Sequence, residues 1–197
     1  MGNVYSDISV SADGFAAGVN QREEAPFGDI DETWLHGWMF DAYEENRVEV
    51  DTIVDSGATV MGRNMFGPVR GEWDRDWRGW WGPNPPYHGP VFVLTHFPHE
   101  PIEMEGGTTF HFVTDGIRSA LDRARSEAGD RNISVAGGAG TVNQFLAAGL
   151  LDELRLHITP CILGAGERIF DGVPPQRLEQ ISVRATPMVT HVTYRRI

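Results

Sequence analysis

Three short segments of the chain carry glycine or small polar residues directly after an apolar run, at 61–64, 94–96 and 136–141. In an open α/β sheet, ligands bind beyond the carboxyl ends of the strands, so these segments are expected to meet at one edge. Glycines 137, 138 and 140 would let the backbone approach a pyrophosphate, and the helix expected after them offers free N–H groups. Taken alone, this cluster is equally compatible with a tight strand-to-helix turn. The three segments together predict a dinucleotide site.

The cations available to such a site are all arginines, because the sequence contains no lysine. This excludes Schiff-base chemistry on lysine and the phosphate-binding lysine of a P-loop. Arg63, directly after Gly62, is the arginine expected to hold a phosphate, and its charge would favour a dinucleotide that carries an additional phosphate. The formal net charge of −12 disfavours nucleic acid as a partner.

Other functional classes leave no signature in the sequence. There is no HExxH motif and no tight acidic cluster, so no metal site is predicted. No apolar run is long enough to cross a bilayer, so no membrane association is expected. The first ten residues do not resemble a signal peptide, and Cys161 is the only cysteine, which predicts a cytoplasmic protein.

The pattern of apolar residues places the elements that must position these segments. Strands are expected at 4–10, 57–61, 91–95, 110–113 and 133–136, and helices at 31–46, 116–128 and 141–148. Further strands are expected at 154–158, 178–184 and 188–195. Strands alternate with helices up to about residue 150 and dominate afterwards. This order predicts an α/β fold with a mostly parallel central sheet and antiparallel C-terminal strands.

The C-terminal strands alternate in character. Leu154, Leu156 and Ile158 lie between polar residues, which is typical of a half-buried strand. Residues 152–158 and 189–194 both include apolar side chains that a monomer would leave uncovered, so a homodimer through these strands is predicted.

A segment at about 67–90 is rich in tryptophan, proline and glycine, and it is predicted to be an ordered excursion from a single domain spanning 1–197. Its four tryptophans suit either of two roles. They could stack on a flat heterocycle, or they could pin a long loop to the body of the protein.

Several of these motifs resemble known sequences. Gly62-Arg63, Leu94-Thr95 and the stretch from Gly137 through Leu146 resemble the dinucleotide-binding segments of dihydrofolate reductases. The segments 154–170 and 9–14 resemble the reductase domain of the bifunctional riboflavin-biosynthesis deaminase–reductase. The motif residues of the longer segment are Pro160, Gly164, Gly166 and Phe170. The resemblance covers nearly the whole chain except 67–90, and it implies the dihydrofolate-reductase-like three-layer fold.

The resemblance also implies a function and a cofactor. The implied activity is NADPH-dependent reduction of a small polar heterocycle, similar to that of 5-amino-6-(5-phosphoribosylamino)uracil reductase. Ser9 and Ala16 would flank the nicotinamide, and Thr95 and His96 would lie near the adenosine ribose and its 2′-phosphate. The implied cofactor residues are Ser9, Ala16, Gly62, Arg63, Asn64, Thr95, His96, Ala136, Gly137, Gly138, Ala139, Gly140 and Thr141.

Two positions depart from the dihydrofolate reductase pattern. Met65 stands where those enzymes have a threonine, which removes a hydroxyl contact to phosphate. Asn46 stands at the spacing of their buried acid. The carboxylates near it are Asp41, Glu44, Glu45 and Glu49.

Of these carboxylates, Asp41 is the best catalytic candidate, because it lies inside an apolar stretch. Asp13, after the first strand, is a second candidate, although Asp-Gly is first of all a turn. A pterin reductase and a non-catalytic ligand-binding member of the fold remain as alternatives.

Overall fold

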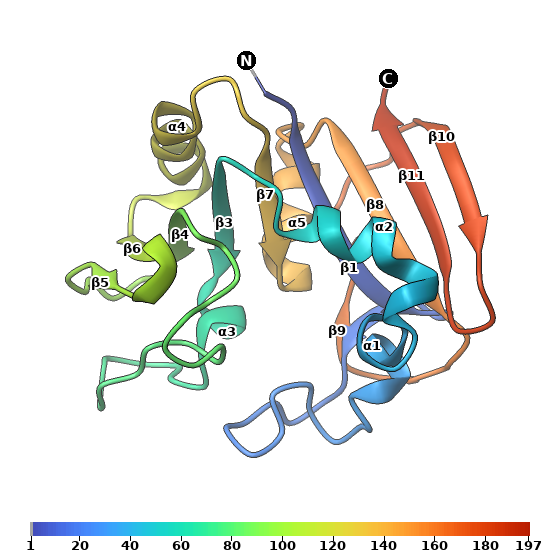
Figure 1. Ribbon diagram of the computed structural model, residues 1–197, viewed down its shortest axis with the longest axis horizontal. Helices are drawn as coiled ribbons and strands as arrows, with labels where there is room; N and C mark the ends of the chain where they lie inside the picture. The colour runs from blue at the N-terminus through green and yellow to red at the C-terminus, as the bar shows by residue number, and fades with distance from the viewer. Residues whose placement is uncertain (1) are drawn as a thin grey trace.

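The computed structural model describes residues 2–197, and its main feature is a nine-stranded sheet (Figure 1). In spatial order the strands are β10 (Leu178–Ala185), β11 (Thr190–Arg196), β8 (Glu153–Thr159), β1 (Val4–Ser11), β7 (Ile133–Gly137), β3 (Ala58–Gly62), β4 (Pro90–Leu94), β6 (Thr109–Val113) and β5 (Ile102–Glu103). The run from β8 to β6 is parallel, and β10, β11 and β5 are antiparallel to their neighbours. The predicted class, with antiparallel strands at the C-terminal end, is confirmed.

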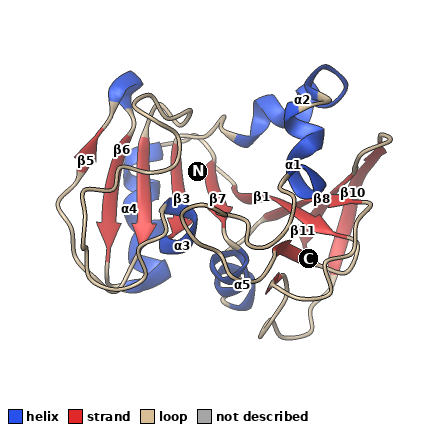
Figure 2. Ribbon diagram, turned by 90° about the horizontal axis from the view of Figure 1, so that it is seen from below, coloured by secondary structure: helices blue, strands red, loops and turns tan. Residues whose placement is uncertain are grey.

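Helices lie on both faces of this sheet (Figure 2). α4 (Gly116–Ala128) and α5 (Ala139–Ala147) cover one face, and α1 (Thr33–Phe40) and α2 (Tyr43–Ile53) lie on the other. Val60 packs in the core cluster that contains residues of α4 and α5, whereas its neighbour Met61 belongs to a second cluster. This alternation along β3 is the period of two that a strand buried on both faces requires.

Four short elements complete the fold. β2 (Phe15–Ala17) pairs with β9 (Glu167–Arg168) in a separate small sheet. α3 (Arg63–Phe66) follows β3, and a turn of 3-10 helix, Glu105–Gly107, precedes β6. β2, β5 and β9 have too few residues to show a periodicity, so the sequence pattern missed them.

The prediction of one helix over 31–46 was wrong, because the chain breaks between α1 and α2. Ala42 leaves the helical conformation with φ −125° and ψ 36°. The Asn46 side-chain amide donates to the carbonyl oxygens of Trp38 at 3.1 Å and Ala42 at 2.9 Å. The buried Trp38 indole N–H in turn donates to Ser9 Oγ of β1 at 3.0 Å. Tertiary packing of Trp38 therefore overrides the local helical pattern.

The 67–90 segment covers the face of β3, β4 and β6 opposite α4. Trp73, Trp77, Trp81 and Tyr87 pack against a cluster of Met61, Phe66, Val91, Val93, Ile102 and Phe110. The Trp77 indole N–H donates to the carbonyl oxygen of Phe66 at 2.9 Å. These tryptophans therefore pin the segment to the sheet, which is the second of the two roles considered for them.

The half-buried pattern of β8 implied that its polar side chains face solvent, but the structure covers this face of the strand. His157 is only 3% exposed, and its ring centroid lies 4.7 Å from that of Trp38 in α1. Because α1 and α2 cover this face, a histidine that alternates with leucines becomes a core residue.

Candidate active site

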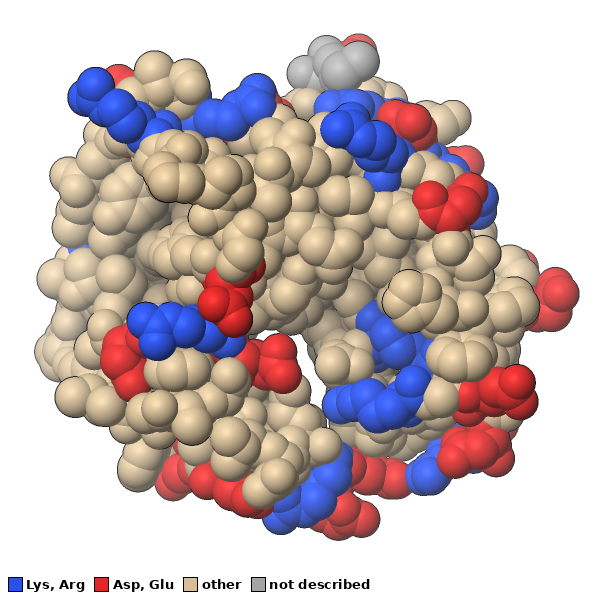
Figure 3. Space-filling model, turned by 180° about the vertical axis from the view of Figure 1, so that it is seen from behind, with Lys and Arg blue, Asp and Glu red and all other residues tan. Residues whose placement is uncertain are grey.

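A cleft of about 910 Å³ lies at the carboxyl ends of β1, β3, β4 and β7. The structure brings the predicted cofactor residues together here, and those lining the cleft are Ser9, Ala16, Gly62, Arg63, Asn64, Thr95, His96, Ala136, Gly138, Ala139, Gly140 and Thr141. Gly137 is buried directly beneath them at the end of β7. Seen from behind, the molecule is hollowed near its centre, and arginine atoms lie on both sides of the hollow (Figure 3).

Glycines at two strand ends permit the close approach that forms this cleft. A Cβ at Gly62 would fall well inside contact distance of Thr141 Oγ1, so only glycine lets β3 end against the first turn of α5. Gly137 has φ +122°, and the peptide bond to Gly138 is cis. Gly138 and Gly140 face open space on the side where a side chain would project. The turn therefore leaves a backbone-lined cradle.

The unpaired backbone N–H groups at the N-terminus of α5 lie at the same cradle. The N–H groups of Thr141 and Val142 donate to the carbonyl oxygen of Gly138 at 3.0 and 3.2 Å. The N–H groups of Ala139 and Gly140 precede these bonds and have no acceptor within the helix. Such a terminus, next to an open cradle, is suited to an anionic group.

Arg63 supplies the positive charge on the β3–β4 side of the cleft. Its Nη1 donates to Thr95 Oγ1 at 2.8 Å, and its guanidinium carbon lies 3.4 Å from the ring centroid of Trp73. Burial lowers the pKa of Arg63, but a guanidinium stays protonated in proteins. α3 is only four residues long, so the charge comes from the side chain and not from a helix dipole. Arg70 also lines the cleft.

The two carboxylates predicted as catalytic lie outside the lining of the cleft. Asp13 accepts hydrogen bonds from Ser11 Oγ at 2.6 Å and from the N–H groups of Leu163 and Gly164 at 3.1 and 2.7 Å. These bonds, the one from Ser11 first, lower the pKa of Asp13 to about 2. Asp41 is the exposed C-cap of α1, because the helix ends there. Asp13 thus holds a turn, and Asp41 points to solvent.

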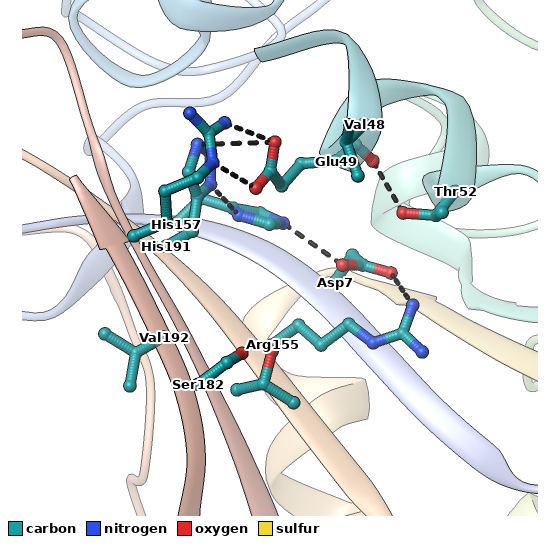
Figure 4. A pocket seen from close by; sticks show the side chains of 11 residues that line it. Asp7, Val48, Glu49, Thr52, Arg155, His157, Ser182, His191 and Val192 are labelled. Carbon is teal, nitrogen blue, oxygen red and sulfur yellow. Dashed lines mark hydrogen bonds and ion pairs between the residues drawn. The ribbon is translucent and has the colours of Figure 1, made fainter. Parts of the chain in front are cut away.

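Four buried polar residues form a connected set beside the cleft. The sequence analysis had named only Asn46 among them, and Figure 4 shows the other three, Asp7, His157 and His191. Asp7 Oδ1 lies 3.1 Å from His157 Nε2, and His157 Nδ1 lies 2.8 Å from His191 Nδ1. His191 Nε2 lies 3.0 Å from Oδ1 of Asn46, which is fully buried. The signal that could have found them is Asp7, a carboxylate in the middle of an apolar strand, where a buried charge requires a partner.

Two classes of feature were not found in the described part of the chain. Within residues 2–197, no helix has the length and apolar character needed to cross a membrane. In the same range, no three His, Cys, Asp or Glu side chains gather in a way that could hold a metal ion.

The fold is similar to that of several solved structures. A putative riboflavin biosynthesis protein from a Shewanella species is 24% identical, and the match covers 99% of both chains with a TM-score of 0.62. RibD of Acinetobacter baumannii is 16% identical, with a TM-score of 0.63, and this chain spans 58% of its length. Dihydrofolate reductase from Enterococcus faecalis, solved with NADP(H), is 13% identical over 98% of this chain, with a TM-score of 0.59. The architecture is therefore dihydrofolate-reductase-like, as predicted.

Sequence comparison identifies relatives and a family. YwjB of Bacillus subtilis, an uncharacterized protein, is 29% identical over 163 residues, which cover 83% of this chain and 79% of YwjB. YyaP of the same organism, also uncharacterized, is 32% identical over 74 residues. The family model described as the RibD C-terminal domain matches residues 3–192, and the chain therefore belongs to the RibD C-terminal domain family.

Proposed function

We propose that this protein reduces a small polar heterocycle with a hydride from NADPH, in a reaction similar to that of 5-amino-6-(5-phosphoribosylamino)uracil reductase. The observation that carries the proposal is the convergence of the strand-end segments of β1, β3, β4 and β7 on one cleft. Membership of the RibD C-terminal domain family supports the same reading. The lone, half-buried cysteine, Cys161, is consistent with a cytoplasmic location.

The chemistry of the cleft suits a dinucleotide. The open cradle at Gly138 and Gly140, next to the free N–H groups of α5, would hold the pyrophosphate. Arg63 and Thr95, which are already hydrogen-bonded to each other, would hold the 2′-phosphate with His96 beside them. Ser9 and Ala16 would flank the nicotinamide. The bound cofactor would supply the hydride, and the protein would hold donor and acceptor together and exclude water.

Binding of NADPH is the first expected result. Cofactor at about 100 times its dissociation constant should stabilise the folded protein by about 2.7 kcal/mol and raise its melting temperature. Trp80 and Trp81 line the cleft, so tryptophan fluorescence should also be quenched. Differential scanning fluorimetry and a fluorescence titration measure the two effects, and a protein unresponsive to millimolar NADPH would refute the proposal.

The two alternatives, a pterin reductase and a non-catalytic binding protein, differ from the proposal in the substrates with which NADPH would be consumed. Asn46, at the spacing where dihydrofolate reductases have their acid, faces His191, so a pterin reductase would have to take its proton from another group of the cleft. A non-catalytic binder would take up NADPH without consuming it. Oxidation of NADPH with a panel of pyrimidine flavin precursors, pterins and small carbonyl compounds distinguishes the three, and consumption with a pyrimidine precursor is the expected outcome.

We also propose a homodimer, but through the outer edge of the sheet, because the apolar side chains of 152–158 and 189–194 on which the prediction rested, such as Leu154 and Val192, are buried within the monomer. β10 is the last strand of the sheet, is exposed along nearly its whole length and presents apolar Ile181 and Val183 to solvent. Unpaired edge strands with apolar side chains favour association. Light scattering should give the dimer mass at micromolar concentration, and Val183→Arg should give the monomer mass. A monomeric wild-type protein would contradict this prediction.

A further inference from the structure

A second, smaller cavity of about 220 Å³ lies behind the wall of the cleft that β1 and β8 form. Asp7 and His157 are the residues common to the linings of both cavities. Figure 4 shows His157 between Asp7 and His191, with the Glu49 side chain of α2 above them. The two side chains are therefore placed to exchange a proton with either cavity.

The orientation of Asn46 determines where the protons of the two histidines lie. Its amide nitrogen donates to the carbonyl oxygens of Trp38 and Ala42, so its oxygen faces His191 and must accept. His191 therefore carries a proton on Nε2. Burial first, and then the neighbouring His157, lower the pKa of His191 to about 4, so this ring is neutral and its Nδ1 is an acceptor.

His157 must then donate from Nδ1 to His191, at 2.8 Å. Its other nitrogen, Nε2, faces a carboxylate oxygen of Asp7 at 3.1 Å, and a hydrogen bond there requires one more proton. If His157 were neutral and Asp7 ionised, the lone pair of His157 Nε2 would face a lone pair of Asp7 Oδ1. All three hydrogen bonds are made only when the set holds this extra proton, and with His191 neutral the proton belongs to the Asp7–His157 pair.

Charged groups surround the pair from every element packed against it. On β8, Arg155 Nη1 lies 3.4 Å from Asp7 Oδ2, and Arg155 Nη2 lies 3.1 Å from Glu153 Oε2. From α2 and β10, the ion pair of Glu49 and Arg184 faces His191, with Glu49 Oε2 4.0 Å from His191 Nε2. From α1, His36 is buried, and its pKa is lowered to about 4, chiefly by that burial.

We propose that the Asp7–His157 pair holds the proton that accompanies the hydride, and that His191 and Asn46 are positioning residues that fix its place. The proposal rests on the reductase function proposed above. Hydride addition to the carbon of a C=N or C=O bond leaves the electron pair of that bond on the heteroatom, which must take up one proton. The pair releases this proton to a heteroatom bound at the β1–β8 wall of the cleft. Water in the smaller cavity then returns one proton to the pair.

The protonation state is tested without cofactor, by two-bond ¹H–¹⁵N NMR of protein labelled at histidine. The expected spectrum at neutral pH shows both nitrogens of His157 protonated and His191 neutral with its proton on Nε2. In Asp7→Asn, a neutral amide no longer stabilises the imidazolium, so His157 should lose a proton. A wild-type His157 with one unprotonated nitrogen would overturn the proposal.

Turnover tests the delivery of the proton. General acids contribute about 10²–10⁴-fold to rates, so Asp7→Asn and His157→Gln should lower kcat by about this factor at neutral pH with little change in KM. In Asp7→Asn, the fall of kcat with rising pH should also move to lower pH. His111→Gln is the matched control, because His111 lies on β6 of the same sheet and lines neither cavity. Circular dichroism verifies that each variant folds.

The outcomes separate the two proposals. Normal turnover and an unchanged pH profile in both folded variants would overturn the proton-holding role alone. A wild-type protein that binds NADPH but reduces no acceptor would overturn the reductase function and the delivery step. The NMR spectrum would still decide whether the pair holds the extra proton.

Discussion

Arg63→Ala is expected to weaken NADPH binding by roughly 10- to 150-fold and to leave NADH binding nearly unchanged. A charge-assisted hydrogen bond contributes about 1.5–3 kcal/mol, and Arg63 is held in place by Thr95 and by the ring of Trp73. NADH lacks the 2′-phosphate, so it does not use this contact. Isothermal titration of both cofactors measures the difference.

Controls for this prediction come from the other arginines. Arg63→Lys keeps a charge but loses the planar stack on Trp73, so it should show an intermediate loss. Arg47→Ala removes an exposed arginine of α2 and should leave both affinities unchanged. Arg70→Ala tests the second arginine of the cleft. Equal losses for NADPH and NADH in Arg63→Ala would mean that Arg63 supports the cleft without contacting the 2′-phosphate.

Phe110→Ala is expected to lower the free energy of unfolding by about 3–5 kcal/mol. Phe110 is 0% exposed, and its ring centroid lies 5.0 Å from that of Phe66 and 6.0 Å from that of Trp81. The substitution removes the ring on which the 67–90 segment packs and leaves a cavity beneath it. Urea denaturation followed by circular dichroism measures the loss.

The matched control is Phe40→Ala, at a phenylalanine that is 76% exposed, where the change should be within about 0.5 kcal/mol. Limited proteolysis of Phe110→Ala should cut the 67–90 segment sooner than in the wild type. If Phe110→Ala were as stable as Phe40→Ala, the tryptophans of this segment would not depend on the core, and the pinning role assigned to them would be wrong.

The cleft could be predicted from the sequence because its signals are local. Apolar runs followed at once by Gly62, by Thr95 and by Gly137 mark the ends of strands, and parallel strands place their carboxyl ends at one edge. Gly62 is also required by packing, because a side chain at this position would collide with Thr141. Strand ends, the sheet type and the glycine-rich turn before α5 therefore follow from residue order alone.

The break between α1 and α2 and the proton-holding pair were decided by tertiary structure. The helical path breaks at Ala42, where the Asn46 side chain of α2 bonds to the carbonyl oxygen of Trp38, and the Trp38 indole of α1 is held by Ser9 of β1. Asp7 and His157 are 150 residues apart, and His157 and His191 are 34 apart, so no local pattern links them. The register of β8 against β1 and β11 places them side by side, and only the cover of α1 and α2 removes the water that would otherwise satisfy them.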